Sequence, residues 1–275
     1  MTADLRECKK RIEWARQHID ALGVLNRQLL EEEQYAFFAD LDRSSGWWTF
    51  RLKAEPVPTE ISFMVGDVLH NLRSALDHLV WQLTIANGNT PDLFPLARKS
   101  NWAKIQFPIA DTPEGFAKSA ASQLWGVSPE CRDFIEGWQP YKTATQPGDV
   151  SILWVLRELS NVDKHRLPNV AVSWLHECRL IEPMQSARAR LEVRTSQWPG
   201  PFTEATEIFG IRYDPIPEHM PDVAIHAETD IAFDEDSGIG RGMPVVETLD
   251  KLESTVHSIV YGSGKLVSAN SWRSP

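Results

Sequence analysis

The chain has 275 residues, of which 42% are hydrophobic and 24% are charged, with a formal net charge of −10 and a pI near 5.3. This length and composition are typical of one large globular domain or two closely packed ones, and give no reason to expect disorder in the bulk of the chain. The negative charge argues against a general nucleic-acid binder, although it is compatible with a nuclease that has a small local basic site.

The first residues, MTADLRECKK, lack the pattern of a secretory signal, and no apolar run approaches the roughly 20 residues that span a bilayer. We therefore expect a cytoplasmic protein with no membrane partner. The three cysteines, Cys8, Cys131 and Cys178, lie far apart and form no CxxC pair. This spacing argues against a zinc site built on thiolates and against a disulfide framework.

The first third of the chain predicts two long helices with a hairpin between them. Apolar residues recur at spacings of three and four from Asp4 to about Glu33, which predicts a helix. The segments YAFFADLD and WWTFRLKA, on either side of RSSG, are aromatic and partly alternating, so we expect a β-hairpin over about 35–54. Two prolines close it, and a second helix is predicted from Thr59 to about Ala86, before the turn residues NGNTPD.

The middle of the chain predicts shorter elements. IQFPI is expected to be extended, and TPEGFAKSAA and SPECRDFIEGW are expected to be short helices. Asp149 is expected to cap a helix that runs through SILWVLRELSNVDKH and ends before Pro168. Beyond it, VAVSWL, ARLEVRT, EIFGIRY and DVAIHAETDIAF predict a small antiparallel sheet. A final helix is expected over about 245–260, followed by GSGKLVSANSWRSP as a loose tail.

Together these elements predict an α+β fold: an N-terminal helical bundle with an inserted β-hairpin, followed by a small antiparallel sheet and a C-terminal helix. We expect two parts in chain order. Residues 1–167 would form a helical domain that carries the hairpin. Residues 168–275 would form a β-rich segment with the closing helix, packed on the first part.

The helix over GDVLHNLRSALDHLVWQL has two unlike sides at about 100° per residue. We expect its aliphatic side to pack against the N-terminal helix and the helix after Asp149. The polar side has no lysine or glutamate between Asp67 and Leu83, although these residues usually fill a solvated helix face. It is therefore equally reasonable to expect that protein or a ligand covers this polar side as that solvent does. The aliphatic residues are Val65, Leu69, Leu72, Leu76, Leu79 and Leu83, and the polar ones are Asp67, His70, Asn71, Arg73, Ser74, Asp77 and His78.

A second polar cluster is ELSNVDKHR, residues 158–166. Its basic residues at a helix C-terminus complement the helix dipole, which is a sufficient structural explanation. Both clusters, however, combine the carboxylate, amide, guanidinium and imidazole groups that a phosphate-handling site needs. We therefore expect Asp163 or His165 to lie within hydrogen-bond or salt-bridge reach of Arg73, Asp77 or His78. The candidate binding residues are His70, Asn71, Asp163, Lys164, His165 and Arg166.

Two resemblances bear on function. The order HNLRSALDHL, FPI, QPY and LRELSNVDKHR resembles a group of uncharacterised bacterial and phage proteins in which an LRxxLDHL helix precedes a DKHR segment. This resemblance covers about residues 60–170 and implies no particular activity. More distantly, Arg73-Ser-Ala-Leu-Asp-His78 matches the R-x4-6-H pattern of HEPN domains, all-helical modules found in many toxin and antiviral ribonucleases.

In HEPN domains two copies of the motif typically face each other across a dimer and cleave RNA without metal. The resemblance implies that Arg73 counters charge on the scissile phosphate and that His78 moves protons during attack by the ribose 2′-OH, with Asp77 in the same catalytic group. It also implies an RNA partner, a homodimer, no cofactor, and a toxin or phage-defence setting. Ser74 departs from the asparagine, aspartate or histidine that often follows the arginine in the family.

Two other interpretations stay open. In one, the protein is a non-catalytic binding or regulatory protein, and the polar face and the DKHR segment form a buried network that locks two helices together. In the other, it resembles the DinB-like metalloproteins and uses His70, His78 and His165 as metal ligands. The metal interpretation is the weakest, because residues 70 and 78 lie about 80° apart around the helix, unlike the i, i+4 pair of a compact site.

Overall fold

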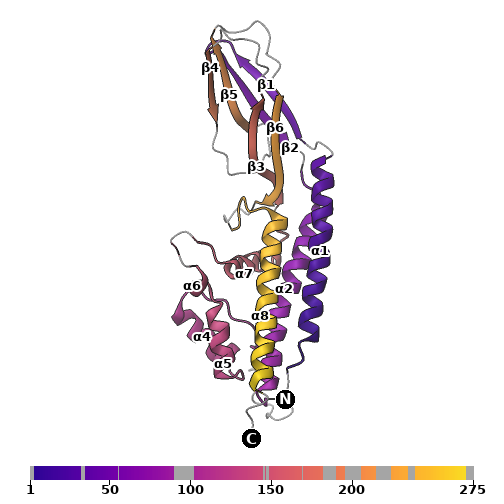
Figure 1. The fold of residues 1–275 in the computed structure, drawn as a ribbon, viewed down its shortest axis with the longest axis vertical. Coiled ribbons are helices and arrows are strands. Elements are labelled where there is room, and N and C mark those ends of the chain that lie inside the picture. Colours follow the sequence, from indigo (N-terminus) through magenta and orange to yellow (C-terminus); the bar gives the residue numbers. More distant parts are fainter. Residues whose placement is uncertain are drawn as a thin grey trace. The chain divides into compact units, whose positions relative to one another are not determined.

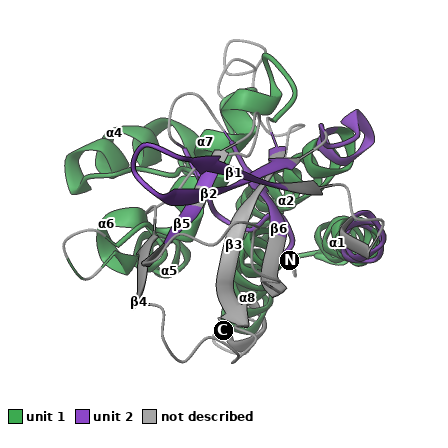
Figure 2. Cartoon of the chain, turned by 90° about the horizontal axis from the view of Figure 1, so that it is seen from above, with its two compact units in different colours: residues 1–21, 63–168, 247–275 green, residues 22–62, 169–246 purple. Residues whose placement is uncertain are grey.

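The computed structural model describes residues 3–31, 35–54, 56–89, 102–144, 146, 149–168, 170–181, 190–195, 206–214, 224–234 and 239–270. Within them the chain forms helices and antiparallel strands, which confirms the predicted α+β fold (Figure 1). The chain divides into two compact units (Figure 2). The helical unit comprises residues 1–21, 63–168 and 247–275, and the strand unit comprises residues 22–62 and 169–246.

This division differs from the expected boundary near residue 167. The hairpin belongs to the same unit as the later strands, and the closing helix belongs to the helical unit. The reason lies in the partners of each element. The second hairpin strand, β2 (Trp47–Ala54), pairs with β5 (Thr206–Asp214). Arg16, near the N-terminus, forms an ion pair with Glu253 of the closing helix.

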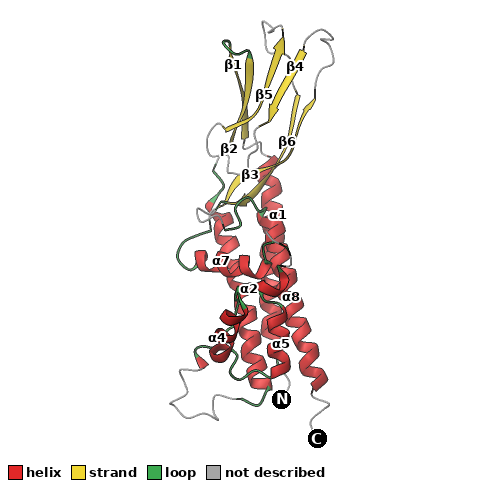
Figure 3. Ribbon diagram, turned by 90° about the vertical axis from the view of Figure 1, so that its left-hand side faces the viewer, coloured by secondary structure: helices red, strands yellow, loops and turns green. Residues whose placement is uncertain are grey.

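Three long helices contribute to the helical unit: α1 (Arg6–Glu31), α2 (Thr59–Ala86) and α8 (Val245–Asn270) (Figure 3). Asp4, just before α1, donates its backbone N–H to the Gln82 side chain near the end of α2 over 3.1 Å.

The aliphatic side chains of α2 are buried, as predicted. Val65, Leu69, Leu72, Leu76 and Leu79 are 0% exposed, and Leu83 is 2% exposed.

Helix α8 continues ten residues beyond the expected end near residue 260, so the prediction of a loose tail is wrong as far as Asn270. Its glycines do not break it, because they allow close packing. A β-carbon on Gly262 would lie 2.7 Å from the Phe134 ring, and one on Gly264 would lie 3.0 Å from Leu5. Residues 271–275 of the expected tail lie outside the described residues.

Four shorter helices complete the described helical unit: α4 (Pro113–Gln123), α5 (Pro129–Gly137), α6 (Pro140–Thr143) and α7 (Ile152–Asp163). The first three begin with a proline, whose missing N–H costs nothing in the first turn. Helix α7 has Ser151 as its N-cap rather than the expected Asp149. The carboxylate of Asp149 accepts the backbone N–H of Gln146 instead.

The strands form two antiparallel sheets rather than the single small one expected. The larger has the order β1-β2-β5-β4, with β1 over Tyr35–Asp42 and β4 over Arg190–Thr195. The smaller pairs β3 (Val170–Ile181) with β6 (Ala224–Phe233). The rings of Phe50 and Phe209 stack across the β2–β5 pair with centroids 4.5 Å apart. The predicted hairpin is thus confirmed, as part of a larger sheet.

No helix in the described part of the chain combines the length and the hydropathy needed to cross a bilayer.

Candidate functional site

The polar face of α2 is covered at Arg73 and Asp77 by the segment that contains Phe107. Arg73 Nη2 donates to the Phe107 carbonyl oxygen over 2.7 Å, and the Phe107 N–H donates to Asp77 Oδ1 over 2.8 Å. The two side chains are themselves 3.1 Å apart, one helical turn from each other. This segment has no regular secondary structure, so its backbone groups need partners of another kind. Residues 73 and 77 provide two of them.

Two further side chains bind the same segment. Gln139, which is 0% exposed, donates to the Pro108 carbonyl over 3.0 Å and accepts the Ala110 N–H over 2.9 Å. Arg157 of α7 donates to the Ile109 carbonyl over 3.2 Å. We call residues 107–110 the clamped segment. The clamp residues are Arg73, Asp77, Gln139 and Arg157.

The clamp explains the motif order seen in the sequence. HNLRSALDHL supplies Arg73 and Asp77, FPI is the start of the clamped segment, QPY supplies Gln139, and LRELSNVDKHR supplies Arg157. Four stretches that are well separated in the sequence therefore meet at one point in the helical unit. Reasoning from the sequence missed Gln139 and Arg157, since hydrogen bonds from side chains to a distant backbone leave no local pattern.

Burial dominates the electrostatics of Arg73 and Asp77. Their side chains are 17% and 31% exposed. Desolvation lowers the pKa of Arg73, and the charge and hydrogen bond of Asp77 oppose this shift. Desolvation raises the pKa of Asp77, opposed chiefly by Arg73, then by the Phe107 N–H, Lys164 and His78. Each charge therefore depends on the other for its stability in the folded state.

A cavity of about 220 Å³ lies beside the clamp, which we call the basic pocket. Its charged lining residues are all cationic: Arg73 from α2, Arg157 from α7, and Lys164 just after α7. Residues 106–109 form part of the wall. The uncharged polar side chains in the lining are Gln106, Ser119, Gln123, Ser160 and Asn161.

The DKHR segment lies close to α2, but not through the contacts expected. Asp163 packs against Gly66, two turns before Arg73, and desolvation raises its pKa, opposed by the charge of His70. Lys164 is the residue of this segment that lines the basic pocket, and its charge lowers the pKa of Asp77. No hydrogen bond or ion pair joins Asp163 or His165 to Arg73, Asp77 or His78 in the described structure.

Of the other predicted site residues, none lines the basic pocket. His78 is exposed and lies about 140° around α2 from Arg73. Its pKa is lowered by desolvation and by Arg11 of α1. Asn71 donates to the Asp67 carbonyl of its own helix over 2.8 Å. The predicted site residues His70, His78, His165 and Arg166 are exposed, and so is Lys164.

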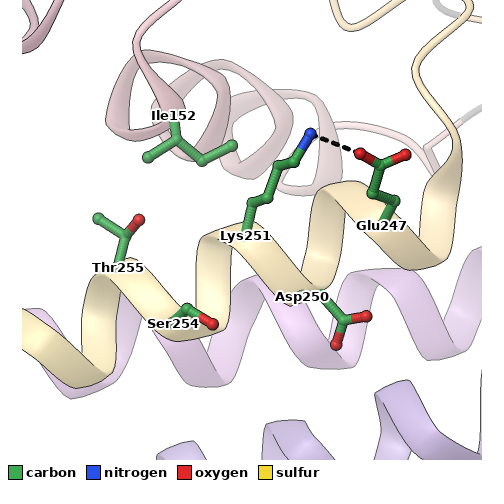
Figure 4. Close-up of a pocket in the computed structure, with 6 residues that line it drawn as sticks. All are labelled: Ile152, Glu247, Asp250, Lys251, Ser254 and Thr255. Atoms are coloured by element: carbon green, nitrogen blue, oxygen red, sulfur yellow. Dashed lines mark ion pairs between the residues drawn. The ribbon is translucent and has the colours of Figure 1, made fainter.

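A second hollow, of about 450 Å³, lies between the start of α7 and α8. Its lining side chains include Lys251, which forms a 2.6 Å ion pair with Glu247 (Figure 4). Asp250 points away from Lys251 in this view and forms an ion pair with Arg16. Each of these three charges already has an ion-pair partner, so they do not converge on a ligand.

Among the described residues, no group of three or more histidine, cysteine, aspartate or glutamate side chains is arranged to hold a metal ion. The suggested ligands His70, His78 and His165 are not brought together. Comparison with protein-family models, with curated proteins and with solved structures gave no match.

Proposed function

We propose that the protein is a non-catalytic binding or regulatory protein, and that the polar face of α2 is part of a structural network rather than a catalytic centre. One observation carries the proposal: the clamp residues, from three separate stretches of chain, bind the backbone of residues 107–110. A buried network whose members satisfy one another fixes a single arrangement of its helices without doing chemistry.

The clamp gives the network a role in binding, because the clamped segment forms part of the wall of the basic pocket. A wall of irregular backbone keeps its shape only while its polar groups have partners. The clamp residues thus organise a pocket that is ready for a ligand.

Purified protein incubated with total RNA and with transfer RNA tests this proposal against catalysis. We expect no cleavage by the wild type. Arg73→Ala should lower the melting temperature by about 5 °C or more, since it leaves Asp77 buried without its partner. His78→Ala, at an exposed position, should leave the melting temperature within about 2 °C of wild type. RNA cleavage by the wild type that both variants lose would contradict the proposal.

A metal-independent, HEPN-like endoribonuclease is the second candidate, in the toxin or phage-defence setting that the resemblance implies. The observation in its favour is that Arg73 lines the basic pocket and uses only Nη2 in its contacts with described residues. Its Nε and Nη1 are free to contact a phosphate. In this alternative His78 acts across a homodimer, because within one chain it lies on a different side of α2. Cleavage in the presence of chelator would favour it.

A further inference from the structure

The basic pocket has the chemistry of a site for a small phosphorylated molecule. Three cations line it, from α2 and from α7 and its C-terminal turn, and no carboxylate is among the described lining residues. A concave site lined by one sign of charge concentrates its field and attracts the opposite charge. The carboxylates that balance Arg73 and Arg157 bind them from outside the lining.

Two of the cations keep donors available for a ligand. Arg73 uses Nη2 for Phe107 and Asp77, which leaves Nε and Nη1 without partners among the described residues. Lys164 forms no ion pair with any described carboxylate within 4.0 Å, although its charge lowers the pKa of Asp77. A guanidinium edge and an ammonium that share one cavity are common partners of phosphate oxygens.

Two orphaned polar groups point to a ligand independently of charge. Ser160 is 6% exposed, and its hydroxyl has no hydrogen-bond partner in the described structure. The buried Oε1 of Gln123 is also without a partner. Buried polar atoms rarely lack partners, so each exception needs an explanation. Both residues line the basic pocket, so that rotation of either side chain would bring its orphaned atom to the oxygens or hydroxyl of a ligand there.

The size of the cavity limits the ligand. The cavity measures about 220 Å³. Drug-sized ligands need roughly 300 Å³ or more. The pocket therefore suits a phosphate group with a short substituent. A nucleic-acid strand, with bases on both sides of each phosphate, does not suit it.

We propose that the basic pocket binds the phosphate of a small phosphomonoester, with Lys164 and Arg73 on its oxygens and Ser160 donating to it. This inference rests on the proposed binding function and names its ligand class. No covalent step is involved. Because the phosphate is the recognised group, inorganic phosphate and methyl phosphate are sufficient probes, and dimethyl phosphate represents the diester linkage of RNA.

The test is calorimetric titration of the full-length protein with each probe, at constant ionic strength set with chloride. We expect saturable, one-to-one binding of inorganic phosphate and methyl phosphate, and at least tenfold weaker binding of dimethyl phosphate. Lys164→Gln should weaken methyl phosphate binding about tenfold or more, because a charge-assisted hydrogen bond is lost. The control Lys251→Gln, a lysine of α8 outside the pocket, should bind as the wild type does.

Ser160→Ala separates a ligand contact from a structural role. It should weaken methyl phosphate binding several-fold while leaving the melting temperature of the free protein unchanged or higher, because the hydroxyl it removes has no partner. The inference is overturned if phosphate does not bind saturably, if Lys164→Gln binds it normally, or if dimethyl phosphate binds equally well. Failure here leaves the proposed function standing, since that is tested by RNA cleavage and by melting of the Arg73 and His78 variants.

Discussion

Gly66 of α2 lies directly against the carboxylate of Asp163, so that a β-carbon at position 66 would collide with Oδ1. This contact joins the start of α2 to the end of α7. Glycine is normally unfavourable within a helix by about 1 kcal/mol relative to alanine. At this position an added methyl group would require the Asp163 carboxylate to turn away.

Gly66→Ala should therefore change the stability by less than about 1 kcal/mol in urea unfolding, because displacement of a carboxylate at the end of a side chain offsets the gain in helix propensity. Gly137→Ala is the matched control, since nothing lies within 4 Å of a β-carbon there. It should be neutral or mildly stabilising. In an Asp163→Ala background Gly66→Ala should be clearly stabilising, and an effect equal to that in the wild-type background would show that the carboxylate is not the obstacle.

Breaking the Arg73–Asp77 pair should cost about 2 kcal/mol for either Arg73→Ala or Asp77→Ala, measured by urea unfolding. A fully buried pair would cost about 3–5 kcal/mol, and the partial exposure of both side chains reduces this. The double variant should cost less than the sum of the single ones, because no orphaned charge remains. Additive costs would argue against a coupled pair.

The control for this cycle is the exposed pair Glu247–Lys251, which has the same i, i+4 spacing, with both side chains 58% exposed. Replacing either member by glutamine should change the stability by no more than about 0.5 kcal/mol.

Gln139→Leu should destabilise by about 2–4 kcal/mol, since it keeps the volume of the side chain but leaves the Pro108 carbonyl and the Ala110 N–H without their partner. Gln123→Leu on α4 is the matched control. Its carbonyl has no partner to lose, so its effect should stay within about 1 kcal/mol. Equal costs for the two substitutions would mean that the clamp contributes no more than an ordinary buried amide.

The pKa of Asp163 is raised, chiefly by desolvation and further by Asp67, with His70 opposing. A carboxyl whose pKa is higher in the folded than in the unfolded state loses stability as the pH rises from about 4, its unfolded value, through the folded one. Asp163→Asn does not ionise. Its stability relative to wild type should therefore increase between pH 3.5 and pH 7 and then level off, as measured by thermal melts. A decrease over this range would contradict the assigned direction.

The sequence predicts those elements whose signals are local. Helix α2 begins and ends at the predicted residues, because two prolines precede it and turn residues follow a regular apolar stripe. The pairing of β2 with β5 is not predictable in this way, since it joins Trp47 to Arg212 across most of the chain. Gly262 and Gly264 suggest an end to α8, yet the helix continues through both, and each packs closely against a side chain distant in the sequence.

The same distinction applies to the candidate site. Arg73, Asp77 and Lys164 stand out in the sequence as polar residues in unusual positions. The structure places Arg73 and Asp77 at the clamp, and Arg73 and Lys164 at the basic pocket. Gln139 resembles any polar residue before a proline. His78 satisfies a sequence pattern with Arg73, but five residues of helix turn the two side chains about 140° apart.

The clamped segment has a consequence for hydrogen exchange. Coil usually exchanges its amide hydrogens quickly, yet Phe107 and Ala110 donate theirs to Asp77 and Gln139. Those two amides can exchange only when α2 or the Gln139 turn moves away, so their protection reports on opening of the helical unit itself. The Ile109 amide, which has no partner among the described residues, lies between them and should exchange quickly. A three-residue alternation of slow and fast exchange, in a stretch with no helix or strand, would mark the clamp in solution.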